Sequence, residues 1–208
     1  MGTNPPDRIK PPVEEPVDLP PKPPRRKRKA AKVPPPAIRA GKNALRIRKA
    51  SVADVEKILE LVNGFAAMNL MLPRGPQYVY ENIRDFVIAV ERAPRGALQK
   101  GESQDSEWVV ACGSLHVLWE DMAEIRALAI RQEYQSLGLG RKIFNHLKKE
   151  AKELGVKHLF TFTMNEEFFK ALGFKKIRRR ELPPKVWGEC SKCPKYFQCD
   201  EVGMISDL

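Results

Sequence analysis

The sequence predicts an α/β protein with a mixed (α+β) sheet, in which helices cover both sides of the one sheet. Three observations predict it. Strand-like runs alternate with helix-like runs, only Glu120 and Asp121 separate two strand-like runs, and paired glycines precede a long amphipathic helix. We expect one domain at residues 44–180, preceded by a proline-rich tail, 1–43, and followed by a cysteine-containing extension, 181–208, packed on the domain.

The N-terminal tail differs from the rest of the chain in composition. It holds 12 of the 18 prolines and no aromatic residue, and it has 11 basic against 4 acidic residues. Such a segment buries too little apolar surface to offset the entropy of ordering it, so we expect a disordered arm. Because most of the net charge of +11 lies in this arm, the domain itself is only mildly basic. A nucleic-acid partner is therefore not expected, although the basic run 25–29 leaves a contact with an acidic surface open.

The sequence carries no signal for a membrane or for secretion. No apolar run reaches the ~18 residues of a membrane span, and the N-terminus lacks the apolar core of a signal peptide. We therefore expect a cytoplasmic protein without a membrane partner, whose four cysteines are reduced or bound to metal. The oligomeric state is left open, with a homodimer as one alternative.

The first half of the domain begins with a strand. Apolar and basic residues alternate in 45–49, and Ser51 or Asp54 is expected to start a helix whose apolar residues recur at helical spacing. The next predicted elements are a loop at 71–78, a short helix passing into a strand at 79–93, and a polar connection at 94–107.

The second half contains a predicted hairpin and a long helix. The hairpin joins strands 108–119 and 122–130, and the helix that follows the paired glycines is expected to end at Gly155. The last predicted elements are a buried strand at 156–163, a short helix at 166–172 and a further strand at 173–182.

The paired glycines, Gly138 and Gly140, mark a candidate anion site. The chain passes there from a strand into a helix without Cβ atoms in the way, so several backbone N–H groups can converge on one anion. The junction lacks the Gly-Lys-Ser/Thr of a Walker loop and the third glycine of the dinucleotide fingerprint. A tight turn or a helix cap is the alternative explanation for the two glycines alone.

The longer string "QSLGLGR", residues 135–141, resembles the Arg/Gln-x-x-Gly-x-Gly/Ala pyrophosphate loop of the GNAT superfamily of N-acetyltransferases. The strings "LAI" at 128–130 and "ALGF" at 171–174 resemble that family's preceding strand and later helix-turn-strand signature, so the resemblance covers about residues 45–180. Within the superfamily, the strings "MLPR", "YENIRDF", "CGSLHVLWEDMAEIRALAI" and "LPPKVWGEC" are similar to those of the short N-acetylglutamate synthases of arginine biosynthesis.

The resemblance implies that acetyl-CoA is the cosubstrate. It places the pantetheine arm along the backbone of one strand end, and the pyrophosphate on the loop that follows. The implied strand residues are Leu128, Ala129 and Ile130, and the implied loop residues are Gln135, Ser136, Leu137, Gly138, Leu139, Gly140 and Arg141.

The resemblance also implies a general base. Glu124 resembles, by its position in "AEIRALAI", the strand glutamate that serves as base in histone acetyltransferases, directly or through water. Its alternative role is a structural ion pair with Arg126, which the strand period places on the same face. A strand amide near Leu128 is the candidate for polarising the thioester carbonyl.

The group that protonates the departing thiolate is harder to predict. Many relatives carry a tyrosine at the position of Phe169, and phenylalanine cannot donate a proton. Tyr134 and Tyr80 are candidate substitutes, and departure as unprotonated thiolate or through water is the alternative.

An acidic amino acid as acceptor needs cationic partners for its carboxylates. Arginine suits them because its planar fork donates two parallel hydrogen bonds. Arg126 and Arg74 are the main candidates, with Arg84 and Arg178 as weaker ones, and the alternative for each is an ordinary surface arginine.

Three cysteines near the C-terminus, Cys190, Cys193 and Cys199, are spaced like a metal clip, and a tetrahedral zinc site needs four ligands. The candidates for the fourth ligand are Cys112, His116 and Asp200. An iron–sulfur cluster, a redox pair and plain structural thiols are the alternatives.

Together these patterns predict an acetyl-CoA-dependent N-acetyltransferase whose acceptor is a small amino acid, with glutamate first. The alternatives are a GNAT enzyme that acetylates another amine, such as a protein N-terminus or a lysine, and an acyl-CoA sensor without catalysis whose arm binds nucleic acid.

Overall fold

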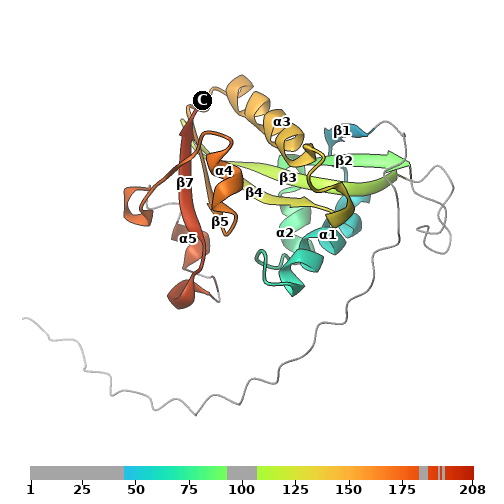
Figure 1. The fold of residues 1–208 in the computed structure, drawn as a ribbon, viewed down its shortest axis with the longest axis horizontal. Helices are drawn as coiled ribbons and strands as arrows, with labels where there is room; N and C mark the ends of the chain where they lie inside the picture. The colour runs from blue at the N-terminus through green and yellow to red at the C-terminus, as the bar shows by residue number, and fades with distance from the viewer. Residues whose placement is uncertain (1–44, 93–106, 183–186, 192, 194) are drawn as a thin grey trace, which may run out of the picture. The chain divides into compact units, whose positions relative to one another are not determined.

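The computed structural model describes residues 45–92, 107–182, 187–191, 193 and 195–208 (Figure 1). The predicted N-terminal arm and nearly all of the predicted polar connection at 94–107 lie outside these ranges. No helix in the described ranges combines the length and the apolar character that a membrane crossing requires.

The described chain forms a mixed sheet of seven strands in the order β1-β2-β3-β4-β5-β7-β6. The central pair, β4 and β5, is parallel, and the other neighbours are antiparallel. This is the predicted fold class. The strands are β1 (Arg46–Lys49), β2 (Phe86–Arg92), β3 (Glu107–Trp119), β4 (Met122–Ile130), β5 (His158–Thr163), β6 (Lys175–Lys176) and β7 (Val202–Asp207).

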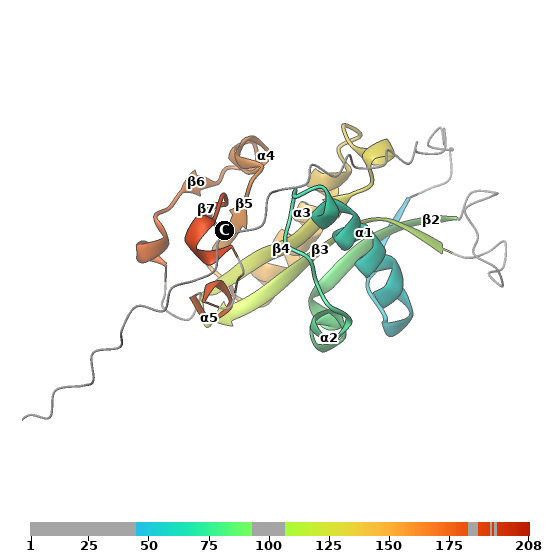
Figure 2. The ribbon, with the colours of Figure 1, turned by 90° about the horizontal axis from the view of Figure 1, so that it is seen from below.

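Helices cover both faces of the sheet, as Figures 1 and 2 show. On one face, α3 (Leu139–Glu153) buries Ile143 and Leu147 against strand residues such as Ala111 and Ile125. On the other face, α1 (Val55–Ala67) and α2 (Pro76–Glu81) enclose a second apolar cluster. Two shorter helices, α4 (Glu166–Lys170) and α5 (Trp187–Cys190), lie in the C-terminal part of the chain.

An ion-pair network fixes the start of α1 to the edge of the sheet. Ser51 and Asp54 form a capping box around a 3-10 turn that leads into α1. Arg48 on β1 donates to both carboxylate oxygens of Asp54 at 2.8 Å and also pairs with Glu107 on β3. Burial raises the pKa of Asp54, but the hydrogen bonds from Arg48 and Ser51 outweigh it and bring the pKa down to about 2.

The structure confirms the predicted hairpin, which turns at Glu120 and Asp121. It also confirms that α3 ends before Gly155, which has φ +79°. The predicted strand at 173–182 is wrong over most of its length. It contains two strand residues, β6, and then a 3-10 turn, Arg179–Glu181, because a run of charged residues has no apolar face to bury. On the side away from β4, β5 pairs with β7, a strand that the sequence did not predict.

Candidate active site

A cavity of about 1140 Å³ opens between β4 and β5. The two described strands pair only from Met122 with His158 to Glu124 with Phe160, and beyond these pairs they diverge (Figure 1). The wall formed by β4 runs from Glu124 to Ile130, and β5 contributes Thr161 to Thr163 to the opposite wall. The divergence therefore exposes the backbone edge of one strand to a ligand.

A β-bulge distorts β4 inside this cavity. The register shifts where Cys112 and Ser114 on β3 face Ala129 and Arg126, and Ala127 takes φ +50°, a left-handed conformation that is strained for alanine. The Cys112 thiol donates to the carbonyl of Ala127, and the Ser114 hydroxyl donates to the carbonyl of Arg126, both at 3.3 Å. Burial raises the pKa of Cys112 to about 12, which keeps its thiol protonated for this bond.

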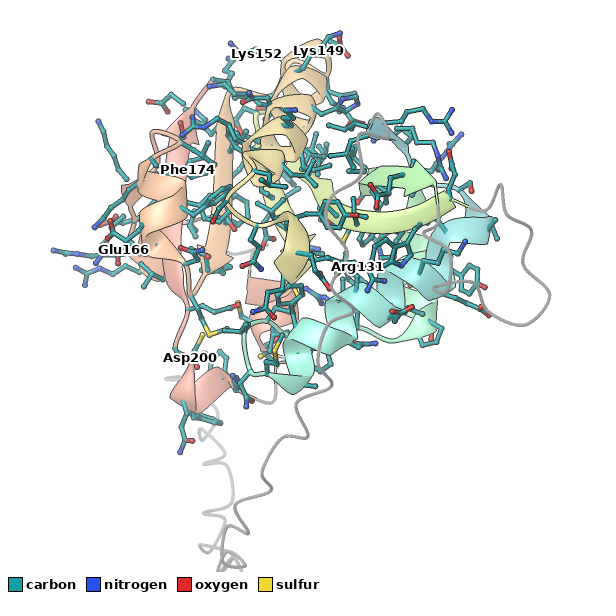
Figure 3. The ribbon with its side chains drawn as sticks, turned by 45° about the vertical axis from the view of Figure 1, so that its right-hand side comes forward. Arg131, Lys149, Lys152, Glu166, Phe174 and Asp200 are labelled. Carbon is teal, nitrogen blue, oxygen red and sulfur yellow. The ribbon has the colours of Figure 1, made fainter. Side chains whose placement is uncertain are left out.

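The end of β4 is tied to α1. Arg131, which directly follows β4, donates to the carbonyl of Val109 at 2.9 Å and to Glu60 of α1 at 3.0 Å. The guanidinium of Arg131, which is labelled in Figure 3, also stacks over Trp108, 4.4 Å from the ring centroid. These contacts fix the exit of the strand toward the glycine loop.

The glycine loop at the start of α3 lines the same cavity. Ser136 and Gly138 both have positive φ, +63° and +74°, so the chain turns twice before the helix begins at Leu139. The Gln135 amide donates to the carbonyl of Ile130 at 3.1 Å and joins the loop to β4. Successive left-handed turns at a helix N-terminus direct backbone N–H groups toward one point and favour an anion there.

The two glycines of the loop are needed for different reasons. Gly138 has open space where a Cβ would stand, but its φ of +74° is unfavourable for other residues. A Cβ on Gly140 would lie 3.2 Å from Phe168 and 3.3 Å from Ile130, so this glycine permits close packing. Arg141 donates from Nη2 to the carbonyl of Ala171 at 3.1 Å, which ties the loop to the turn after α4.

Glu124 and Arg126 form a buried ion pair on the cavity wall. Arg126 Nε donates to Glu124 Oε2 at 2.6 Å, and the two residues are 7% and 8% exposed. The predicted ion pair is therefore present, and both partners face the cavity. The guanidinium therefore orients the carboxylate on the cavity wall.

Arg74 stands close to this pair. Its guanidinium lies over the ring of Tyr78, 4.1 Å from the centroid, and Arg126 Nη1 donates to the Tyr78 hydroxyl at 3.5 Å. The side-chain amide of Asn63 on α1 makes two hydrogen bonds to the backbone of Arg74, at 2.9 and 3.0 Å. Asn63 thus fixes the loop, and Tyr78 links the two arginines.

The weaker candidate arginines do not contribute to the cavity. Arg84 and Arg178 are exposed, and neither lines it. The Arg178 backbone N–H instead binds the Glu181 carboxylate at 3.2 Å.

The candidate proton donors for the thiolate differ in their access to the cavity. Phe169 lines the cavity and packs against Phe174, with ring centroids 5.3 Å apart. Tyr134 lines the cavity too, but its hydroxyl donates to the buried carboxylate of Glu91, and burial followed by this bond raises its pKa well above the usual range. Tyr80 is exposed on α2 and does not line the cavity.

The predicted metal site is not present in the part of the chain that the structure describes. No group of three or more His, Cys, Asp or Glu side chains there is arranged to hold a metal ion. Cys190, Cys193 and Cys199 line the cavity instead. Of the proposed fourth ligands, Cys112 is buried under the bulge, His116 pairs with Asp85, and Asp200 pairs with Lys195.

Several residues of the site were not predicted. Tyr78 lines the cavity and Asn63 holds the Arg74 backbone next to it, in segments for which the sequence predicts only a loop and a helix. Thr161, whose hydroxyl donates to the carbonyl of Ile125 at 2.9 Å, spans the start of the divergence, and Thr163 accepts from the Asn165 backbone N–H at 2.9 Å. No sequence pattern marks these residues, because their role depends on which strand lies next to β4.

Three features of this site belong together: the sheet diverges at one parallel pair, one wall carries a bulged strand, and the loop after that strand leads into a helix start suited to an anion. They are typical of a class of protein, the acyltransferases that take their acyl group from a CoA thioester. The profile of the acetyltransferase (GNAT) family matches residues 64–174, which is more than half of the chain. The chain belongs to this family, and it is an acetyl-CoA-dependent N-acetyltransferase.

Two relatives match over most of the domain. An uncharacterized N-acetyltransferase of Chlorobaculum tepidum is 33% identical over 162 residues, which are 78% of this chain and 96% of that protein. An amino-acid acetyltransferase of Mycobacterium tuberculosis is 31% identical over 150 residues, which are 72% of this chain and 78% of that protein.

Two solved structures share the fold. N-acetylglutamate synthase from Neisseria gonorrhoeae, complexed with coenzyme A and N-acetyl-glutamate, matches with a TM-score of 0.66 at 21% identity, over 79% of this chain and 35% of that one. This chain thus spans about a third of that protein. A Mycobacterium tuberculosis protein in complex with CoA and a ligand abbreviated NLQ matches with a TM-score of 0.59 at 27% identity, over 78% and 99% of the two chains.

Proposed function

We propose that the protein transfers the acetyl group of acetyl-CoA to the α-amine of L-glutamate and so makes N-acetyl-L-glutamate, as in arginine biosynthesis. One observation carries this proposal. Arg74 and Arg126, linked by Tyr78, face the same cavity as Glu124, so two cations and one candidate base surround a single site.

The cofactor half of the site is proposed to be the glycine loop and the free edge of β4. The pyrophosphate binds the N–H groups from Gln135 to Arg141, where the dipole of a 15-residue helix adds favourable potential. The pantetheine arm pairs with the backbone of Leu128, Ala129 and Ile130, because β5 leaves this edge of β4 open. This arrangement brings the thioester next to the bulge.

The acceptor half binds the two carboxylates. We assign one carboxylate to Arg126, beside the base, and the other to Arg74, which reaches the cavity from the loop before α2. Bidentate pairing with arginine is among the stronger ways in which a protein recognises a carboxylate. Asn63 supports this role of Arg74 by fixing its backbone with two hydrogen bonds.

The reaction follows from these positions. Glu124 takes a proton from the substrate ammonium, and the neutral amine attacks the thioester carbonyl carbon. The backbone amide near Leu128, which the bulge turns away from the regular ladder, stabilises the tetrahedral oxyanion. The C–S bond then breaks, the attacking nitrogen gives up its second proton to water, and CoA departs as the thiolate. Since Phe169 has no proton to give and Tyr134 is bonded to Glu91, the thiolate leaves unprotonated or takes its proton from water.

The relatives support an amino acid as the acceptor. The amino-acid acetyltransferase of Mycobacterium tuberculosis is similar over most of its own length, and its name states the class of acceptor. The two arginines on the cavity wall favour an acidic member of that class, because a guanidinium can bind a carboxylate through two parallel hydrogen bonds.

A panel of amines tests the proposal. The purified full chain is mixed with acetyl-CoA, and free thiol is measured with glutamate, glutamine, aspartate, an uncharged amino acid and a lysine-containing peptide. We expect glutamate to give the highest kcat/KM and mass spectrometry to identify N-acetylglutamate. A rate with the peptide alone would favour acetylation of a protein amine, and thiol release with none of these amines would contradict the proposal.

A further inference from the structure

His116 stands directly opposite Glu124 in the sheet. The antiparallel register between β3 and β4 pairs these two residues, so their side chains project to the same face with Cβ atoms about 5 Å apart. On its other side Glu124 is paired with Phe160 of β5, which is apolar. His116 is therefore the titratable side chain next to Glu124 in the register of the three strands.

Asp85 fixes the orientation of the His116 ring. The Nδ1 atom of His116 lies 2.8 Å from Asp85 Oδ2, and Asp85 belongs to a 3-10 turn, Ile83–Asp85, directly before β2. An ionised carboxylate can only accept, so Nδ1 carries the hydrogen and Nε2 keeps a lone pair. The side chains of His116 and Asp85 are 30% and 28% exposed, so this pair reaches solvent while Glu124 is buried.

Acetyl transfer needs a route for protons from Glu124 to solvent, because the reaction releases a proton at a buried site. The substrate ammonium, R–NH₃⁺, becomes the amide R–NH–COCH₃, so its nitrogen loses two protons in each cycle. One of them balances the CoA thiolate as it becomes the thiol, and the other must reach bulk water. Glu124, ion-paired with Arg126 and 8% exposed, must give up the proton that it has taken before the next cycle can begin.

We propose that His116, held by Asp85, relays this proton from Glu124 to solvent. The Nε2 atom accepts the proton, directly or through one water molecule, and Asp85 stabilises the imidazolium until water or buffer removes the proton. His116 acts through Glu124 and does not touch the substrate, so it is a positioning and relay residue. This inference rests on the proposed role of Glu124 as base and does not depend on which amine is the acceptor.

The chain contains a matched control for this proposal. His158 on β5 makes the same contact with a carboxylate, from Nδ1 to Asp207 Oδ1 at 2.8 Å, and it is also partly exposed. Its partners in the sheet are Met122 and Asp207, and neither faces Glu124 in the register. A His–Asp pair that matters only for structure is therefore available for comparison in the same protein.

The kinetic test compares His116→Asn with His158→Asn. Asparagine keeps an N–H donor for the aspartate but cannot carry a proton away. We expect His116→Asn to lower kcat on the order of tenfold, with the KM for acetyl-CoA unchanged, and added imidazole to restore the rate in proportion to its concentration. His158→Asn is expected to leave kcat unchanged and insensitive to imidazole. An unchanged kcat in His116→Asn, or a loss that imidazole does not repair, overturns the relay.

A second measurement does not require turnover. The sequence contains only three histidines, so their ring nitrogen resonances can be assigned in the full chain. We expect Glu124→Gln to change the ¹⁵N shifts of the His116 ring and leave those of His158 unchanged, and equal spectra would overturn the relay. If glutamate is not acetylated but another amine is, the acceptor assignment fails, and the kinetic comparison is made with that amine.

Discussion

In the described ranges, two pairs of an arginine with a buried carboxylate serve different ends. In the pair of Arg48 with Asp54, the carboxylate also accepts from Ser51 and lies against the start of α1. In the pair of Arg126 with Glu124, the carboxylate faces a cavity of about 1140 Å³. Because the chemistry of the two pairs is alike, the cavity beside one of them, rather than the ion pair itself, marks the candidate functional site.

The largest effect is expected at the pair that faces the cavity. Glu124→Gln removes the proposed base, and we expect kcat to fall on the order of 10²–10³-fold, most strongly at low pH, where the amine is hardest to deprotonate. The matched control is Glu120→Gln in the exposed turn of the same hairpin, which should keep the rate. A pH–rate profile measures both variants, and an unaltered profile in Glu124→Gln would argue for another base.

The structural pair should show the reverse behaviour. Asp54→Asn is expected to reduce the free energy of unfolding by about 1–2 kcal/mol near neutral pH and to leave kcat almost unchanged. The pKa of Asp54 is held at about 2, below its ordinary value of 3.8, so the stabilisation is complete above the ordinary pKa and is lost as the pH falls through the folded one.

Urea unfolding at several pH values measures this effect. The difference between wild type and Asp54→Asn should shrink as the pH is lowered below about 4. A large loss of activity with unchanged stability would remove the distinction between the two pairs.

A smaller effect on binding is expected at Arg74. Arg74→Met keeps an unbranched apolar side chain but removes the guanidinium that lies over Tyr78, and we expect the KM for glutamate to rise about tenfold, with the KM for acetyl-CoA unchanged. Arg84→Met, at an exposed position outside the cavity, is the control. Equal KM values for glutamate in both variants would show that Arg74 does not hold the acceptor.

The smallest effect concerns the bulge that positions the cavity pair. Ala127→Gly removes the strain of φ +50° and is expected to stabilise the fold by up to about 1 kcal/mol. Ala127→Val should destabilise it, because a β-branched residue does not tolerate this conformation. Urea unfolding of both variants gives the two signs, and equal stabilities would mean that the bulge carries no strain.

The sequence predicts much of the scaffold because local patterns determine it. The helical spacing of Ile143, Phe144 and Leu147 predicts α3, and two residues between apolar runs predict the hairpin. Gly138 is predictable as a turn because glycine favours a positive φ. These features depend on residues close together in the chain.

The remaining features depend on distant contacts. No residue preference predicts the left-handed conformation of Ala127, because alanine is not a typical turn residue. The bulge is instead supported by Cys112 and Ser114 on β3, which donate hydrogen bonds to the carbonyls of Ala127 and Arg126. The position of β7 beside β5 and the hydrogen bonds of Asn63 to Arg74 likewise bring together residues far apart in sequence. The sequence offered Glu124 and Arg126 as partners, but it could not show that a cavity lies beside them.

The short pairing between β4 and β5 also has a mechanical consequence. Only three residue pairs join these two described strands, so the β1–β4 part and the β5–β7 part of the sheet meet at a notch. A ligand that lies in this notch contacts both walls, so it should restrict bending motions between the two parts of the sheet. Coenzyme A is thus expected to slow amide hydrogen exchange along the facing edges of both strands, far beyond the atoms that it touches.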